Sequence, residues 1–174
     1  MTNGSRAFYE ATRKVRDFLL ALENVNTVTF GDIREVDLNK QTIFPLSHVM
    51  VDNVVLASGT MTFSITVLAM DVVHEYKGDK IEGEPYPDNS IMAQYEDTDL
   101  TYFGTDNEQD VLNDQLSVVN LLNQSLTRST LRTDKFELTG QGSCEPFVDR
   151  FENKLAGWAY TFTAFVENDI NICE

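Results

Sequence analysis

The sequence predicts an α+β fold, a single domain in which two main helices pack on an antiparallel or mixed sheet. Apolar residues recur at helical spacing at about 6–22 and again at about 106–127, which indicates the two helices. Apolar and polar residues alternate at 60–69 and 158–164, which is typical of half-buried strands. A length of 174 residues suits one domain, so we expect 1–174 to fold as a unit.

The first helix is predicted from apolar residues three, four and seven positions apart, with charged residues on the other faces. Ser5 is suited to capping its start, and Asn24 and Asn26 mark its end. The residues that form its apolar face are Phe8, Val15, Phe18, Leu19 and Leu22.

Four strand-like segments follow the first helix. Residues 28–30 are short and β-prone, and 42–46 contain Pro45, which suits the start of a strand or an edge. The valine-rich stretch 48–56 also indicates sheet. The clearest strand has alternate apolar residues separated by Thr and Ser: Met61, Phe63, Ile65, Val67 and Ala69.

Regular patterning stops between 78 and 104, and we interpret this stretch as an acidic loop insertion. Seven Asp or Glu residues stand there against Lys80 alone, together with Pro85 and Pro87. Such a segment buries too little apolar surface to offset its ordering entropy, so we expect it to order only against a partner. Its aromatic residues would supply the contact: Tyr86, Tyr95, Tyr102 and Phe103. The alternative is a solvated, disordered loop that has no partner.

The second helix is predicted to begin at a capping box, Thr105 to Glu108. Its apolar stripe is expected to pack on the sheet through Leu112, Leu116, Val119, Leu122 and Leu126, and it is widened by Val111, Val118 and Leu121. A terminal hairpin follows, from Phe147 through a charged turn to a strand whose aromatic face includes Trp158 as a core anchor.

The charge balance disfavours a nucleic-acid reader. Twenty-eight acidic residues stand against thirteen basic ones, a formal net charge of −15 that repels phosphate. We expect no signal peptide, because the first residues include no apolar region, and no membrane segment. Two widely spaced cysteines, Cys144 and Cys173, form no disulfide framework and favour a reducing cytoplasm.

No motif for catalysis or cofactor binding is present, so we expect neither an enzyme nor a cofactor. His48 and His74 fall in predicted strands and are expected to be structural or surface residues. The cysteines match no zinc spacing. Two pairs of acids could bind a divalent cation, although solvated carboxylates are the default: Glu35 with Asp37, and Asp97 with Asp99.

The order of elements resembles the tail terminator (tail completion) proteins of long-tailed bacteriophages and related neck-ring subunits. The resemblance is carried by the helical start at 8–22, by DNEQDVLN at 106–113 and by RFENKLAGW at 150–158. It implies a homo-oligomeric ring, a hexamer or a multiple, that joins the tail to the head connector in the virion after synthesis in the host cytoplasm. It also implies other phage neck, portal or tail proteins as partners, and no cofactor or active site.

An acidic wall would let DNA pass without specific binding, since no counterion release favours attachment. For the subunit interface we expect Phe44, Pro45, Tyr86, Tyr95, Tyr102 and Phe103. These aromatic residues could instead close the domain's own core. Alternative functions are a head–tail adaptor or stopper ring, a small acidic ligand- or calcium-binding module, and an enzyme whose site is assembled from scattered residues.

Overall fold

The computed structural model describes residues 6–38, 41–74, 107–128, 131, 136–150 and 154–167. The predicted insertion at 78–104 and the predicted cap Thr105 lie outside these ranges. The helices are α1 (Arg6–Leu20), α2 (Glu108–Arg128) and two short 3₁₀ helices, η1 (Ile33–Glu35) and η2 (Gln41–Ile43). The strands are β1 (Thr27–Phe30), β2 (Leu46–Ala57), β3 (Thr60–Val72), β4 (Phe136–Leu138), β5 (Ser143–Arg150) and β6 (Leu155–Glu167).

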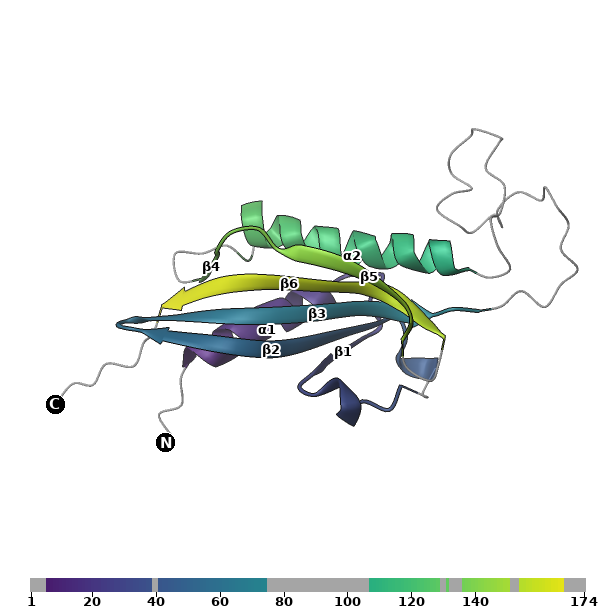
Figure 1. Ribbon diagram of the computed structural model, residues 1–174, viewed down its shortest axis with the longest axis horizontal. Helices are drawn as coiled ribbons and strands as arrows, with labels where there is room; N and C mark the ends of the chain where they lie inside the picture. Colours follow the sequence, from purple (N-terminus) through teal and green to yellow (C-terminus); the bar gives the residue numbers. More distant parts are fainter. Residues whose placement is uncertain are drawn as a thin grey trace, which may run out of the picture.

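The strands form one six-stranded mixed sheet in the order β1-β2-β3-β6, with β4 and β5 both paired to β6 (Figure 1). β1 and β2 run parallel, and every other pair is antiparallel. β5 and β6 form the C-terminal hairpin that the sequence predicts. Two helices on a mixed sheet make an α+β domain, so the predicted fold class is confirmed.

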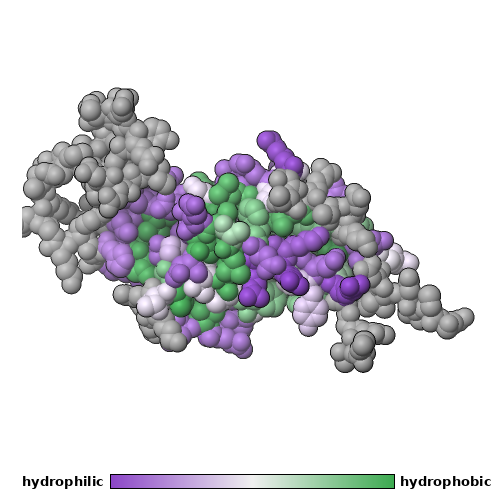
Figure 2. All heavy atoms as spheres, turned by 180° about the vertical axis from the view of Figure 1, so that it is seen from behind, coloured by the Kyte–Doolittle hydropathy of each residue, from purple (hydrophilic) through white to green (hydrophobic). Residues whose placement is uncertain are grey.

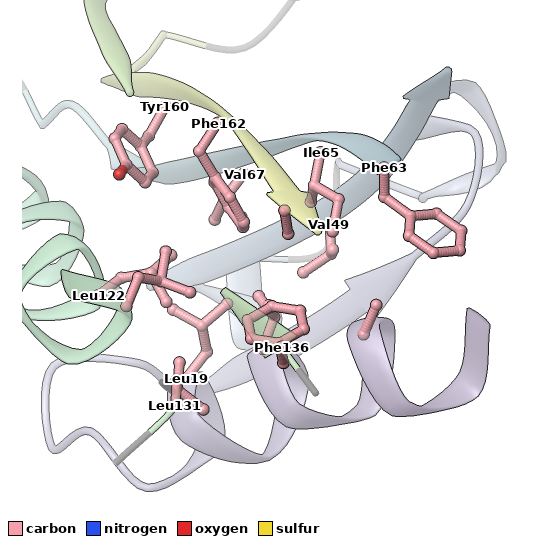
Figure 3. Packing of buried hydrophobic residues seen from close by; sticks show 14 of the residues in the cluster. Leu19, Val49, Phe63, Ile65, Val67, Leu122, Leu131, Phe136, Tyr160 and Phe162 are labelled. Carbon is pink, nitrogen blue, oxygen red and sulfur yellow. The ribbon is translucent and has the colours of Figure 1, made fainter. Parts of the chain in front are cut away.

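Both helices pack against the same side of the sheet, which we call the helix side (Figures 1 and 3). The main core lies between these layers. Leu19 of α1 and Leu122 of α2 are fully buried there with Phe63, Ile65 and Phe162 of the strands. Among the helices that the structure describes, none is long and apolar enough to cross a lipid bilayer.

α2 buries most of the predicted stripe, including Val119, Leu122 and Leu126, but its buried face is turned away from Leu116 and Leu121. Leu116 was placed within the buried stripe, but its side chain is 40 % exposed, and Leu121 is 45 % exposed. That prediction was wrong because Gln115 and Ser125 occupy buried positions that a search for apolar spacing passes over. The residues that α2 buries are Val111, Gln115, Val118, Val119, Leu122, Ser125 and Leu126.

Two close contacts fix the position of β6. Its predicted anchor, Trp158, is half-buried against the main core, and the indole N–H donates to the Leu112 carbonyl of α2 at 2.7 Å. At Gly157 the neighbouring strand β3 leaves no room for a side chain. A Cβ there would meet the Ala69 carbonyl oxygen and lie 2.8 Å from the Met70 Cα.

β2 contains a bulge at Asp52, where its register with β3 shifts between Val51 and Asn53. One extra residue reverses the alternation of side chains along a strand. Val51 pairs with a core residue before the bulge, and Val54 and Leu56 pair with core residues after it. The bulge therefore keeps apolar side chains on the helix side along the whole strand.

The side of the sheet away from the helices is covered at one end by the segment between β1 and β2. That segment closes a second core, which contains Phe44, Leu46, Leu68, Met70, Phe147 and Leu155. Beyond it the central strands present half-buried hydroxyl side chains, Thr62, Ser64, Thr66, Thr161 and Thr163. The alternation along β3 and β6 therefore matches a sheet with one buried side and one partly solvated side.

Candidate subunit interface

The predicted interface residues that the structure describes offer little surface to a partner. Phe44 is 9 % exposed and packs in the second core. Pro45 is half-buried, and its carbonyl accepts hydrogen bonds from the backbone N–H groups of Asn26 and Thr27. Burial of Phe44 favours the interpretation that it closes the domain's own core. The other predicted interface residues lie outside the described residues: Tyr86, Tyr95, Tyr102 and Phe103. The acidic pair Asp97 and Asp99 and the cysteine Cys173 also lie outside them.

His48 is fully buried in β2, and both of its ring nitrogens have partners. Nδ1 lies 2.7 Å from the Thr29 hydroxyl, and Nε2 lies 3.0 Å from the Gly31 carbonyl oxygen. A carbonyl only accepts, so Nε2 carries the proton and Nδ1 accepts from Thr29. Burial lowers the pKa of His48. This imidazole is a structural group that joins β1 to β2, whereas His74 is exposed just beyond β3.

Three carboxyl groups lie where β3 ends and α2 begins: Asp71, Asp110 and Asp114. Burial raises the pKa of each carboxyl group. The negative charge of Asp110 further raises the pKa of Asp114, and the charge of Asp114 further raises the pKa of Asp71. Within the described ranges no group of three or more His, Cys, Asp or Glu side chains is arranged to hold a metal ion. Glu35 and Asp37 are exposed to solvent.

The outer edge of β2 is open over the half nearest the β2–β3 turn. β1 pairs only with 46–49, and no other described strand pairs with the outer side of residues 50–57, which we call the open β2 edge (Figure 1). Unpaired N–H and C=O groups along such an edge can pair with another chain. Val55 and Leu56 are 55 % and 72 % exposed there. Asp52 is the one charged residue of the segment, which contains no Pro or Lys to blunt it.

A groove of about 410 Å³ lies at the opposite edge of the sheet, between α2 and β5. Among the strands that the structure describes, β5 pairs with β6 alone, so the groove lies beside a second open edge. We call it the α2–β5 groove. Its lining contains no charged residue and consists of Asn113, Leu116, Ser117, Val119, Asn120, Asn123, Gly142, Cys144 and Tyr160.

The titratable groups of the groove stay neutral. The Tyr160 hydroxyl donates to the Asn123 side-chain oxygen at 2.9 Å, and burial raises the pKa of Tyr160 to about 12. Burial also raises the pKa of the Cys144 thiol. A thiol is a nucleophile only as the thiolate, so neutral groups of this kind suit non-covalent contact rather than chemistry. The groove offers apolar surface and uncharged hydrogen-bonding groups.

The surface seen from behind, on which α1 lies, shows hydrophobic residues in its middle with hydrophilic residues around them (Figure 2). The large apolar residues exposed on the two helices are Tyr9, Leu20, Leu116 and Leu121. Singly exposed apolar residues are ordinary on protein surfaces. Leu116 differs from the other three because it also lines the α2–β5 groove.

Neither open edge was among the interface residues predicted from sequence. Which strand lies at an edge depends on the order of strands in the sheet, and the sequence pattern of a single segment does not predict that order. The available signal was the run Val54, Val55 and Leu56, which has too many apolar residues for a strand with one solvated side.

A scan against models of known protein families finds no match, and no curated protein matches the chain. The two open edges and the groove are therefore the features from which a function is inferred.

Proposed function

We propose that the chain is a non-enzymatic structural subunit that assembles with copies of itself into a ring at the neck or tail junction of a tailed bacteriophage. The observation that carries the proposal is a sheet with two different open edges, one with exposed apolar side chains and one beside a groove. A ring requires two different surfaces, because each copy contacts its two neighbours in different ways.

The position in a phage rests on the resemblance to tail terminator proteins in the order of elements. The arrangement of α1, the sheet, α2 and the terminal hairpin is compatible with it. The net charge of −15 supports a DNA conduit, because an acidic wall gains nothing from releasing counterions from DNA. A head–tail adaptor or stopper ring would use the same two edges.

Light scattering after size-exclusion chromatography, over a series of protein concentrations, tests the proposal. We expect a discrete oligomer whose population increases with protein concentration. It should show a central opening in negative-stain electron micrographs. Calcium should leave this behaviour unchanged. A chain that stays monomeric at every concentration and compacts on adding calcium would instead be a calcium-binding module, and the proposal would fall.

Salt gives a second readout of the same experiment. Copies that each carry −15 repel one another, and salt screens that repulsion, so self-association should strengthen as salt rises. Binding to DNA has the opposite dependence and weakens with salt. Retention of duplex DNA by the oligomer at low salt, lost at high salt, would contradict the conduit role.

A further inference from the structure

The two open edges of the sheet have complementary hydrogen-bonding groups. The open β2 edge and the outer edge of β5 each present backbone N–H and C=O groups that no described strand uses. Pro146 in β5 has no N–H, so a ladder on β5 is confined to its N-terminal part. Cys144 in that part and Gly142, which precedes the strand, line the α2–β5 groove.

The side chains at the two edges also fit one another. Leu56 pairs with the core residue Met61, so it lies on the helix side, where it is 72 % exposed. Cys144 pairs with the core residue Tyr160, and both line the groove, which therefore also opens on the helix side. A strand added to β5 would place its helix-side residues over the groove. Leu56 would then lie against Leu116.

The low charge of these two surfaces suits contact with a second copy of this chain. Two molecules of net charge −15 repel one another, so they can associate closely only where both surfaces are nearly neutral. The open β2 edge carries Asp52 alone, the groove lining carries no charge, and Glu145 is the one charged residue in the N-terminal part of β5. The neutral groove offers nothing to an ionic ligand, but it suits the exposed valine and leucine side chains of the open β2 edge.

We infer that the open β2 edge of one copy adds as a strand to β5 of the next, with Leu56 seated in the α2–β5 groove. This inference rests on the proposed ring. The contact is heterologous, since it joins two different surfaces, so the same contact between successive copies continues the sheet from one copy to the next. The copies form a closed ring when a whole number of the rotations that relate neighbours makes one full turn. The sheet of each subunit thus becomes a segment of one larger sheet.

Two variants test the pairing by complementation. Leu56→Asp damages the edge and leaves the groove intact, and Leu116→Asp damages the groove and leaves the edge intact. Both side chains are substantially exposed, so both variants should fold, which circular dichroism and urea unfolding check. Each alone should weaken self-association by about tenfold or more. An equimolar mixture should form a dimer and nothing larger, because each mixed pair retains one intact edge and one intact groove.

The matched control is Leu121→Asp, which changes a leucine of similar exposure on the same helix outside the groove. It should assemble like the wild type, and loss of assembly there would overturn the assignment to the groove. Wild-type rings together with a mixture that stays monomeric would overturn the inference and leave the proposed function standing. A wild-type chain that is monomeric at every concentration removes both.

Disulfide capture reports the same contact without disturbing the fold. In a Cys173→Ser background, Val54→Cys or Leu56→Cys should form an intermolecular disulfide with Cys144 in oxidised glutathione. Val55→Cys, on the opposite side of the same strand, should not. Equal capture at all three positions, or capture that survives Cys144→Ser, would show random collision and refute the pairing.

Discussion

Leu122 and Leu116 provide a matched test of how α2 lies on the sheet. They are the same residue type on one helix, yet Leu122 is fully buried in the main core (Figure 3), whereas Leu116 is 40 % exposed. Truncation to alanine removes the same atoms at both positions, and the change in intrinsic helix propensity is the same. Any difference in stability between Leu122→Ala and Leu116→Ala therefore reports burial.

Leu122→Ala should lower the free energy of unfolding by about 2 to 5 kcal/mol, since it loses burial and leaves a cavity among Leu19, Phe162 and their neighbours. Leu116→Ala should lower it by about 1 kcal/mol, because solvent fills the vacated space. Urea unfolding measures both. With a slope of about 2 kcal/mol per molar urea, the midpoint for Leu122→Ala should fall by about 1 to 2.5 M.

Equal midpoint shifts in the two variants, or a larger shift for Leu116→Ala, would refute this orientation of α2. Leu116 would then be buried as its apolar spacing first predicted, and the α2–β5 groove would not exist as described. A change in the slope instead of the midpoint would mean that the substitution altered the denatured or native ensemble, and the comparison would then use thermal unfolding as a second measure.

Two further predictions concern the sheet. Because burial lowers the pKa of His48 below 6.5, the unfolded chain takes up a proton below pH 6.5 that the native chain excludes, so stability present above pH 6.5 is lost on acidification. The urea midpoint of the wild type should decrease when the pH is lowered from about 7.5 to about 5.5, and the decrease should be smaller in His48→Gln. The same pH dependence in both proteins would contradict this. Gly157→Ala should abolish soluble folding because a Cβ meets the backbone of β3, whereas Gly59→Ala, in an open turn at φ +78°, should cost about 1 to 2 kcal/mol. Similar melting of these two variants would place β3 and β6 farther apart.

Local patterns in the sequence were sufficient to predict the strands that build the core. Alternation at Met61 to Ala69 and at Trp158 to Ala164 predicted both the strands and their buried sides, and the structure confirms both. This succeeded because a period of two is a property of consecutive residues. The start of α2 was also placed to within about two residues, a usual uncertainty for helix ends.

Features that depend on distant parts of the chain were not predicted. The rotation of α2 depends on what the helix meets across the sheet, and polar Gln115 is buried while apolar Leu116 is exposed. The parallel pairing of β1 with β2 and the pairing of β3 with β6, which no local pattern predicts, set the order of the strands and so decide which edges stay open. The predicted interface at Phe44 used an apolar residue whose partners, such as Phe147, lie a hundred residues away in the chain.

The lengths of the elements explain why this domain has surplus sheet. Strands of 12 and 13 residues, as in β2 and β3, extend for about 40 Å or more. α1, with 15 residues, spans about 22 Å, and β1 has only four residues with which to pair β2. These neighbours cannot cover the full length of the β2–β3 hairpin, so its far half keeps an open edge (Figure 1). In a domain that functioned alone, such an open edge would be an aggregation hazard. Strands that extend beyond α1 and β1, with few charges in a strongly acidic chain, instead suit the pairing with another copy that we propose.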